Sequence, residues 1–344
     1  MMEKFKPFDK ELVRAAMDSP FRDVIECEEF RRLKNISFLG AIDTWLTSRT
    51  EETTGNSNRY HHSIGVYSIA LFISKFDTNI PKNEIKLFQA VALLHDLGHA
   101  PLSHSVEFLF EKQFGLNHHK NTNNLINNRK SQLFVILRSM NIQPSDITLA
   151  LDKKVNLSFS KYFNGHFNID TLDGIYRCFS ILNKKPDFSL NQTIKASLLT
   201  YNANKNEIIL DSFWRMKGYV YNLLIYDGFG RIADELAQNH VAKRIDLLRE
   251  EMFMYSDQEF FSVFPELENE ISSDVSKATS GHYPNHLERY RHRNFSIREK
   301  CHLKSYRDIC GRYYQETLAW EKGRSDKLRG IIPTQEPSQR ELAF

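Results

Sequence analysis

Glycine and proline are scarce in this chain. Its 344 residues include only 14 glycines and 10 prolines. Regions built from many strands need such residues at their tight turns, so this composition argues against an extensive β structure. The sequence predicts a mostly α protein.

Cysteine and long apolar runs are also scarce. The four cysteines (Cys27, Cys178, Cys301 and Cys310) form no CxxC motif, which excludes a disulfide framework or a zinc knuckle and indicates a reducing compartment. No segment approaches the roughly 18 consecutive apolar residues of a membrane span. The first residues, MMEKFKPFDKELV, lack the apolar core of a signal peptide. We expect a cytoplasmic protein with no membrane partner.

Neither sign of charge dominates. The formal net charge is +3, which is too small to force binding to nucleic acid or to a membrane by bulk electrostatics. Positive charge does gather in 282–329, a segment that we expect to be helical. It includes Arg289, Arg291, Arg293, Arg298 and Lys300. This segment could bind nucleic acid, form an oligomer contact or simply be a solvated helical face.

Apolar residues recur at helical spacing through most of the chain. Residues 1–50 are predicted to be helical, and 48–58 is a polar loop by composition. Further helices are expected at 59–78, 82–98, 103–114, 119–140, 167–182 and 213–253. Residues 193–210 alternate around the turn-rich NANKN and therefore predict a small β-hairpin.

The most informative segment is AVALLHDLGHAPLSH at residues 90–104. The adjacent His95 and Asp96 follow an apolar run, so two good metal donors lie at the inner end of a helix that we expect to be buried. An ion would offset the cost of burying the carboxylate. His99 follows His95 by four residues and shares its helical face. His104 comes just after Pro101.

Two other segments carry possible ligands. RYHHSIGV opens a helix and offers His61 and His62, while FNIDTLDGIYR offers Asp170 and Asp173. Each of these residues alone has an ordinary structural explanation, such as a core histidine or a helix cap. Together, four donors from three helices are what a helical bundle needs to hold one ion. The HDxxH spacing does not indicate a zinc protease, because Asp is shorter than the Glu of HExxH.

The order RYxHSxGV, LLHDLGHxPxSH and DxxD resembles the HD superfamily. It resembles most closely the deoxynucleoside triphosphate triphosphohydrolases, which include bacterial dGTPases and the animal SAM-and-HD-domain dNTPase. The similarity is strong over about 59–104, moderate through 178, and weaker at FWRMKGYVYNLL and SDQEFF. It implies a helical HD-domain bundle and a divalent cation (Mn, Fe, Ni, Co, Zn or Mg). The implied metal ligands are His62, His95, Asp96 and Asp170.

The resemblance also implies roles for neighbouring residues. Arg59 matches an arginine that contacts phosphate, and His99 and His104 match histidines that engage phosphate or the attacking water. His119 aligns best with the catalytic histidine, and His118 is the alternative. Asp173 could orient a histidine, bind a second ion or contact substrate. Phe38 and Tyr176 complete the expected substrate-binding set.

Several sugar-reading positions depart from the family pattern. The motif DxxDYxxRD reads DTLDGIYRC, so Gly174 replaces a tyrosine and Cys178 replaces an aspartate. Phe38 stands in place of a glutamine that reads the sugar, and Thr171 in place of a phosphate-binding lysine. The metal set is complete, but deoxyribose recognition is expected to be changed, because a site lacking hydrogen-bond partners loses discrimination.

The resemblance divides the chain into an N-terminal helical segment and loop (1–58), an HD phosphohydrolase core (59–182), a hairpin and helices completing the catalytic domain (183–265), a basic helical region (266–329) and a mobile tail (330–344). We expect a metal-dependent phosphohydrolase acting on a nucleotide or related phosphoester, assembled as a homo-oligomer. Two alternatives remain open. One is a nuclease or a hydrolase of a modified or signalling nucleotide, and the other is a non-catalytic nucleotide-sensing module.

Overall fold

The computed structural model describes residues 8–49, 58–199, 203–226, 229–278, 289–303 and 309–321. Within these ranges the chain is mostly helical, as the sequence predicts, with one two-stranded antiparallel sheet. No helix in the described part is long and apolar enough to cross a membrane. The polar loop predicted at 48–58 lies largely outside the described residues, and the predicted mobile tail at 330–344 lies entirely outside them.

The elements follow one another along the chain in this order. The first half contains α1 (Phe8–Met17), α2 (Arg22–Glu26), α3 (Glu28–Arg31), η1 (Arg32–Asn35), α4 (Ala41–Arg49), α5 (Arg59–Phe76), α6 (Lys82–Leu94), α7 (His104–Phe114), α8 (His118–Asn127), α9 (Gln132–Ser139), α10 (Pro144–Leu151) and η2 (Ser160–Phe163). The second half contains α11 (Ile169–Ile181), α12 (Leu190–Ile194), η3 (Lys195–Leu199), α13 (Ala203–Val220), η4 (Tyr221–Tyr226), α14 (Phe229–Lys243), η5 (Ile245–Leu247), η6 (Glu250–Met254), α15 (Asp257–Val263), α16 (Leu267–Ala278), β1 (Arg289–Ile297), α17 (Ile309–Arg312) and β2 (Tyr313–Glu321).

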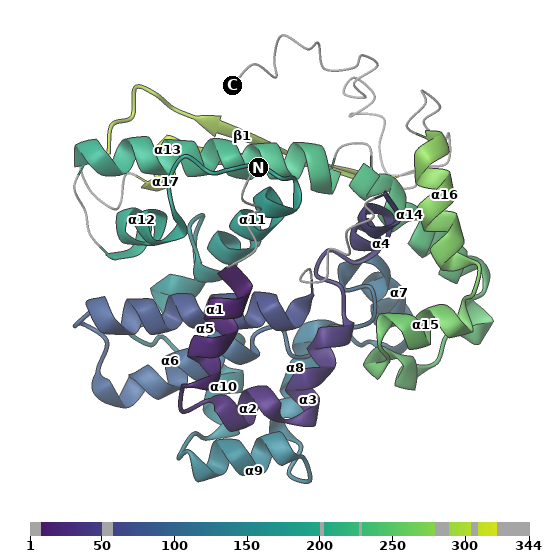
Figure 1. Cartoon of the computed structure of the whole chain (residues 1–344), viewed down its shortest axis with the longest axis horizontal. Coiled ribbons are helices and arrows are strands. Elements are labelled where there is room, and N and C mark those ends of the chain that lie inside the picture. Colours follow the sequence, from purple (N-terminus) through teal and green to yellow (C-terminus); the bar gives the residue numbers. More distant parts are fainter. Residues whose placement is uncertain are drawn as a thin grey trace.

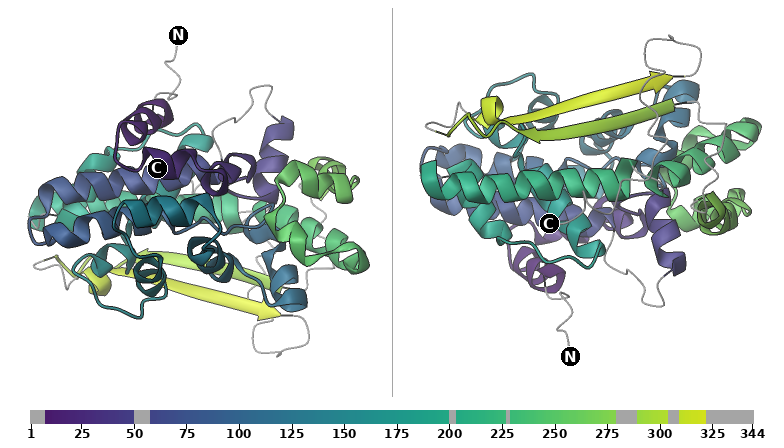
Figure 2. Two further views of the ribbon diagram at one scale, coloured as in Figure 1. Left: turned by 90° about the horizontal axis from the view of Figure 1, so that it is seen from below. Right: turned by 90° about the horizontal axis from the view of Figure 1, so that it is seen from above.

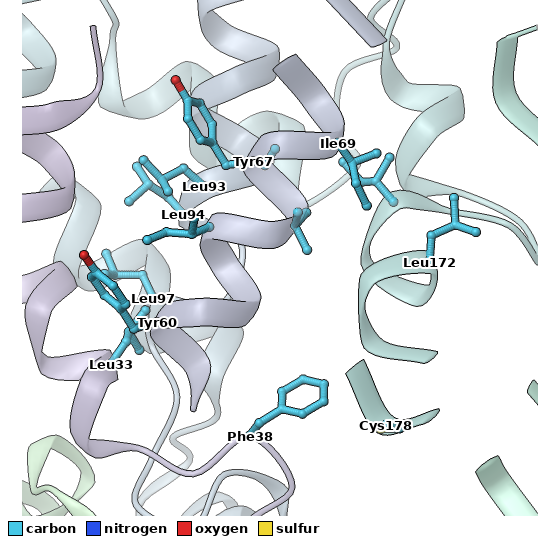
Figure 3. Close-up of a cluster of buried hydrophobic side chains, with 14 of the residues drawn as sticks. Leu33, Phe38, Tyr60, Tyr67, Ile69, Leu93, Leu94, Leu97, Leu172 and Cys178 are labelled. Atoms are coloured by element: carbon cyan, nitrogen blue, oxygen red, sulfur yellow. The ribbon is translucent and has the colours of Figure 1, made fainter. Parts of the chain in front are cut away.

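Helix α5 is central to the core. It contacts α6, α1 and α11, and most of its residues are buried, including Tyr60, Tyr67 and Ile69. Figure 3 shows these side chains gathered with Leu93 and other apolar residues between the helices. A helix buried on most of its surface needs few charged residues, which explains why α5 reads as apolar on nearly every face.

The helix α13 extends along one side of the molecule, and the hairpin of β1 and β2 runs beside it (Figures 1 and 2). The hairpin has a regular register, with Arg289 opposite Glu321 and Ile297 opposite Tyr313. Phe295 packs on Trp214 and Tyr221 with ring centroids 5.4 and 5.1 Å apart.

The predicted position of the β-hairpin is wrong. The described part of 193–210 is helical, and it includes α12, the π-helical turn η3 and the start of α13. A capping box at Ser189 starts this segment, and Asn206 donates to the Ala196 carbonyl at 3.1 Å, so the asparagine-rich stretch is bonded within helices rather than in a turn.

The hairpin instead lies at 289–321, inside the region predicted to be basic and helical. Strand β1 has its apolar residues Phe295 and Ile297 two apart, which is the period of a strand. Arg289, Arg291 and Arg293 occupy the preceding alternate positions of the strand and conceal this alternation. Packing on α13, which lies about 80 residues earlier in the sequence, supplies the apolar surface that stabilises the strands.

Candidate metal centre and adjoining histidine cluster

Three helix termini converge on the candidate metal centre. His62 lies in the first turns of α5, His95 is the C-terminal cap of α6 with Asp96 after it, and Asp170 lies in the first turn of α11. Asparagine side chains cap two of these helices, because Asn58 accepts from the His61 amide and Asn168 from the Thr171 amide. These caps fix where α5 and α11 begin and hence where their ligand residues point.

The four predicted ligands lie close together. His62 Nε2 is 3.1 Å from Asp170 Oδ1 and 3.5 Å from Asp96 Oδ2. His95 Nε2 is 3.5 Å from Asp96 Oδ1 and 3.9 Å from Asp170 Oδ1. The side chain of His62 is 1% exposed, whereas that of Asp170 is 55% exposed. The centre is therefore buried on the α5 and α6 side and open at Asp170.

The other ring nitrogen of each histidine is already bonded. His62 Nδ1 lies 2.7 Å from Asp173 Oδ2, and His95 Nδ1 lies 3.0 Å from the Ala92 carbonyl. An Nδ1 atom that donates to oxygen leaves Nε2 as the acceptor, so both Nε2 lone pairs are directed at the same small space. Metal-binding histidines are commonly oriented in this way by a carboxylate or carbonyl.

The residues present fit a divalent cation. Nε2 of His62 and of His95 are both buried and have no hydrogen-bond partner of acceptable geometry among the described residues. A buried acceptor without a partner is costly, and a cation would satisfy both. Two imidazoles and two carboxylates suit Mn, Fe, Co, Ni or Zn.

The charges around the centre depend strongly on one another. Burial would raise the pKa of Asp96, but its interactions with His95, His99 and Arg59 hold it well below the usual value. Burial would lower the pKa of His62, but without a cation the carboxylates of Asp170 and Asp173 raise it to about 9. A cation that binds Nε2 would therefore displace a proton from His62. Arg59 is 2.6 Å from Asp96 Oδ2 and donates to Ser103 Oγ at 2.9 Å. Arg59 therefore bonds directly to a candidate ligand.

A second group of histidines adjoins the metal centre. His99, His104 and His118 bring one ring nitrogen each to within 4.8 Å of the others. The rings of His99 and His118 stack with centroids 4.4 Å apart and planes 6° apart. His99 Nε2 is also 3.3 Å from Asp96 Oδ1. Burial and the charge of Arg59 hold the pKa of His99 well below its usual value, so its ring is neutral.

Glu107 joins two members of this group. Its Oε2 is 2.8 Å from His104 Nδ1, and its Oε1 is 2.5 Å from His118 Nδ1. Burial would raise the pKa of Glu107, but its bonds to these histidines hold it far below the usual value. The carboxylate is therefore ionised, and it holds both rings by Nδ1 so that Nε2 is left for other partners.

The two candidate catalytic histidines of α8 occupy different places. His118 contacts both His99 and His104, with ring centroids 4.4 and 5.1 Å away. His119 contacts His118 at 3.9 Å and belongs to neither group of possible ligands among the described residues. Burial and the charge of His118 lower the pKa of His119. The geometry thus favours His118, the alternative of the sequence prediction.

The expected substrate-binding residues do not all face the same space. Asp173 is 2% exposed, and it is bonded to His62 and to Arg177 Nε at 3.1 Å. Tyr176 donates to the Phe188 carbonyl at 2.8 Å and lies 2.6 Å from Thr193 Oγ1, so its hydroxyl is directed toward α12. Phe38 is nearer the centre, with its ring 4.7 Å from that of His62.

Phe38 and Gly174, two positions that depart from the family pattern, lie next to each other in the structure. A Cβ added to Gly174 would lie 3.6 Å from the Phe38 ring, so the phenyl ring lies against the face of α11 that lacks a side chain. Cys178, one turn along α11, is 2% exposed, and burial raises the pKa of its thiol. This wall of the site is therefore apolar.

Three contributors to the site were missed by sequence reasoning. Glu107 follows His104 by three residues, a helical spacing that could have indicated the contact. Arg177, which holds Asp173, is likewise four residues from its partner. Arg32 donates to the carbonyls of Leu97 and His99 at 3.1 and 2.7 Å, across more than 60 residues of sequence, and no local signal announces it.

Comparison with known proteins is consistent with this geometry. Residues 59–145 match the family model of the HD domain. This segment is similar to the HD domain, and the chain has distant similarity to deoxynucleoside triphosphate triphosphohydrolases, as the sequence motifs predict. Domains of this family are generally hydrolases that bind divalent metals.

Two relatives and one solved structure illustrate the similarity. The uncharacterized protein YwfO of Bacillus subtilis is 41% identical over 108 residues, which are 30% of this chain and 23% of YwfO. The deoxynucleoside triphosphate triphosphohydrolase SAMHD1 homolog of Dictyostelium discoideum is 29% identical over 105 residues, 28% of this chain and 19% of that protein. This chain thus matches less than a quarter of either relative. A hypothetical protein from Aquifex aeolicus has the same fold, with a TM-score of 0.59 and 17% identity over 93% of this chain and 96% of that one.

Proposed function

We propose that this chain is a metal-dependent phosphohydrolase that cleaves a phosphate bond of a nucleotide. The observation that carries the proposal is the pair of buried Nε2 atoms of His62 and His95, which face two carboxylates and have no hydrogen bond of acceptable geometry with any described residue. Three further histidines adjoin them. The names of the SAMHD1 relatives support a nucleotide as the substrate.

His62, His95, Asp96 and Asp170 would hold the cation. A cation bound there would supply Lewis-acid chemistry, by lowering the pKa of a water molecule and polarising a phosphoryl oxygen. Arg59 holds Asp96 in position through its 2.6 Å contact, and its positive charge beside the centre favours a bound phosphate. Asp173 and Ala92 keep the two imidazoles turned to the centre.

The adjoining histidines would handle phosphate oxygens and protons. Neither ring nitrogen of His99 makes a hydrogen bond of acceptable geometry with a described residue, although Nε2 lies 3.3 Å from Asp96 Oδ1. This neutral ring can therefore bond a phosphoryl oxygen or a water molecule. His118 is held by Glu107 and leaves Nε2 for the leaving oxygen, to which it would donate a proton. His104, with a side chain 60% exposed, lies at the entrance to the group.

Sugar recognition is proposed to differ from that of the dNTPases. The apolar wall of Phe38, Gly174 and Cys178 offers no strong hydrogen-bond acceptor for a sugar hydroxyl. A pocket of this kind discriminates weakly between deoxyribose and ribose, because no buried polar group is left unpaired by either sugar. We therefore expect similar turnover of dNTPs and NTPs.

A substrate screen tests the proposal. Purified protein is assayed with dNTPs, NTPs, monophosphates, dinucleotides and single-stranded nucleic acid, with Mn, Mg, Ni, Co and Zn added in turn. The double variant His95→Ala with Asp96→Ala is expected to lose both metal content and hydrolysis. His302→Ala, which changes an exposed histidine distant from the centre in sequence, is the control. Undiminished hydrolysis in the double variant would refute the proposal.

The same screen addresses the alternatives. Cleavage of single-stranded nucleic acid with a steep loss of binding at high salt would indicate a nuclease that uses the basic residues of 282–329. Metal and nucleotide binding without turnover would indicate a sensing module. A homo-oligomer remains our expectation, and sedimentation measurements would test it.

A further inference from the structure

Lys217 is a buried lysine that the proposed mechanism does not use. It lies on α13 and is 4% exposed. Its ammonium lies 3.4 Å from the His166 carbonyl, and it lies over the rings of Trp214 and Phe295, 5.0 and 5.7 Å from their centroids. Trp214 lies one turn earlier on α13 itself, whereas His166 lies in the loop before α11 and Phe295 on β1. Lys217 is therefore enclosed by its own helix and by two other parts of the chain.

No carboxylate lies within 4.0 Å of the Lys217 ammonium in the described part of the structure. Burying an ammonium without an anion is unfavourable, and aromatic faces with one long carbonyl contact compensate only partly. Among the described residues, no carboxylate pairs directly with this buried ammonium.

The contacts of Lys217 place it beside the segment that leads to the candidate ligand Asp170, and a second cation lies near it. Burial and the charge of Arg293 lower the pKa of Lys217 to about 8, while the charge of Asp170 opposes this change. The His166 carbonyl that Lys217 contacts lies four residues before Asp170, and α13 contacts α11, which begins at Ile169. Lys217 therefore lies on the α11 side of the centre, where Asp170 is the most exposed of the four candidate metal ligands. Thr171, the residue after Asp170, brings no charge to this side.

The hairpin brings Arg293 to the same place. A Cβ added to Gly218 would lie 3.3 Å from Phe295 Cβ, so the absence of a side chain at Gly218 lets β1 approach α13 closely. Arg293 and Phe295 lie on the same face of β1, and Arg293 donates to the Tyr221 hydroxyl at 3.0 Å. The right view of Figure 2 shows the hairpin running beside α13.

We propose that Lys217, assisted by Arg293, binds the phosphate groups of the nucleotide substrate at the open side of the metal centre. This inference rests on the proposed function. Lysine binds phosphate as a point charge, and the apolar surroundings of Trp214 and Phe295 strengthen its attraction for an anion. The hairpin that carries part of the basic segment would then serve the substrate site directly.

A structural role for Lys217 predicts a different outcome from a substrate-binding role. If its contacts with Trp214 and Phe295 mainly stabilise the fold, Lys217→Met should lower the melting temperature. If Lys217 is a buried cation kept for an anionic ligand, removing the charge should leave the melting temperature of the ligand-free protein unchanged or higher, because an apolar chain of similar length is easier to bury.

The test compares Lys217→Met with Lys86→Met, a control at an exposed position of α6. With the divalent cation in excess over pyrophosphate, we measure metal content, the KM and kcat for nucleoside triphosphates, and the Ki of pyrophosphate. For Lys217→Met we expect KM and Ki to rise about 10- to 100-fold, with metal content kept. Arg293→Gln is the second variant, with a smaller rise expected in the Ki of pyrophosphate.

The outcomes separate this inference from the proposed function. A wild-type protein that turns over no nucleotide refutes the proposed function, and calorimetric titration of wild type and Lys217→Met with pyrophosphate then still tests the anion site. Equal pyrophosphate affinity in these two proteins would overturn the inference. If Lys217→Met does not fold, a wild-type Ki in Arg293→Gln would overturn it.

Discussion

His62 Nδ1 lies 2.7 Å from the carboxylate of Asp173, and this contact determines which nitrogen of His62 faces the other three candidate metal ligands. Asp173 is itself held by Arg177, whose Nη2 also donates to the His61 carbonyl at 3.0 Å. A Cβ at Gly65 would lie only 1.9 Å from Asp173 Oδ1, so a glycine is needed where α5 meets α11. The metal centre therefore depends on residues behind its ligands.

Replacing Asp173 should weaken metal binding without removing a ligand. In Asp173→Asn the amide can no longer hold His62 by charge, and changes in such orienting partners commonly cost about 10- to 100-fold in metal affinity or activity. Metal titration followed by an activity assay measures this effect. Asp146→Asn, at an exposed position of α10, is the control. Unchanged metal affinity in Asp173→Asn would show that the contact does not orient His62.

The two histidines of α8 should differ in their contribution to catalysis. His118 is held by Glu107 against His99, so His118→Ala should lower kcat by about 100-fold or more, as expected for loss of a general acid. His119→Ala should have a much smaller effect. Steady-state kinetics at equal metal content distinguish the two. A larger loss of kcat in His119→Ala than in His118→Ala would instead identify His119, which the family resemblance favours, as the catalytic histidine.

Gly98 should tolerate no larger side chain. A Cβ there would lie 2.2 Å from the Thr122 amide nitrogen and 2.3 Å from the His118 carbonyl, so Gly98→Ala must displace α8 and its histidines. We expect a loss of about 1–3 kcal/mol in the free energy of unfolding, together with reduced activity.

Gly174→Ala is the matched control for Gly98→Ala. Its added Cβ meets only the Phe38 ring at 3.6 Å, an ordinary contact. Alanine is also the better helix former, by about 1 kcal/mol. Thermal denaturation should therefore show a higher melting temperature for Gly174→Ala and a lower one for Gly98→Ala. Equal melting temperatures would contradict the close approach of α8.

Asp77 makes a pH-dependent contribution to stability. Its hydrogen-bond partners are not residues of the metal centre. Burial would raise its pKa, but hydrogen bonds from Tyr162, Lys161 and Asn79 lower it from 3.8 to about 2. A carboxyl whose pKa is lowered by folding stabilises the protein above its unfolded pKa, and this stabilisation is lost as the pH falls toward the folded pKa.

Asp77→Asn should therefore lose about 2 kcal/mol of unfolding free energy at pH 7. The difference from wild type should shrink to about half near pH 3 and approach zero below the folded pKa. Urea denaturation of both proteins at several pH values measures it. A difference that stays constant between pH 7 and pH 3 would exclude this linkage.

Sequence and structure agree best where local rules act. The helices α5, α6, α7 and α11 begin and end within a few residues of the predicted bounds, because caps such as Asn58 and Asn168 and the breaker Pro101 are local signals. The candidate ligands likewise stand in short motifs at the termini of these helices. Local signals failed at 193–210 and at the hairpin, where packing between distant segments decides the conformation.

The sequence by itself determined the helical class, the termini at which the site residues stand and the chemical types of the candidate ligands, since these depend on neighbouring residues. Only the tertiary structure decided which of the two α8 histidines faces His99, that Tyr176 is directed toward α12, and that Lys217 is enclosed between Trp214 and Phe295. Each of these features depends on a contact between side chains of different segments of the chain, and no local sequence pattern encodes such a contact.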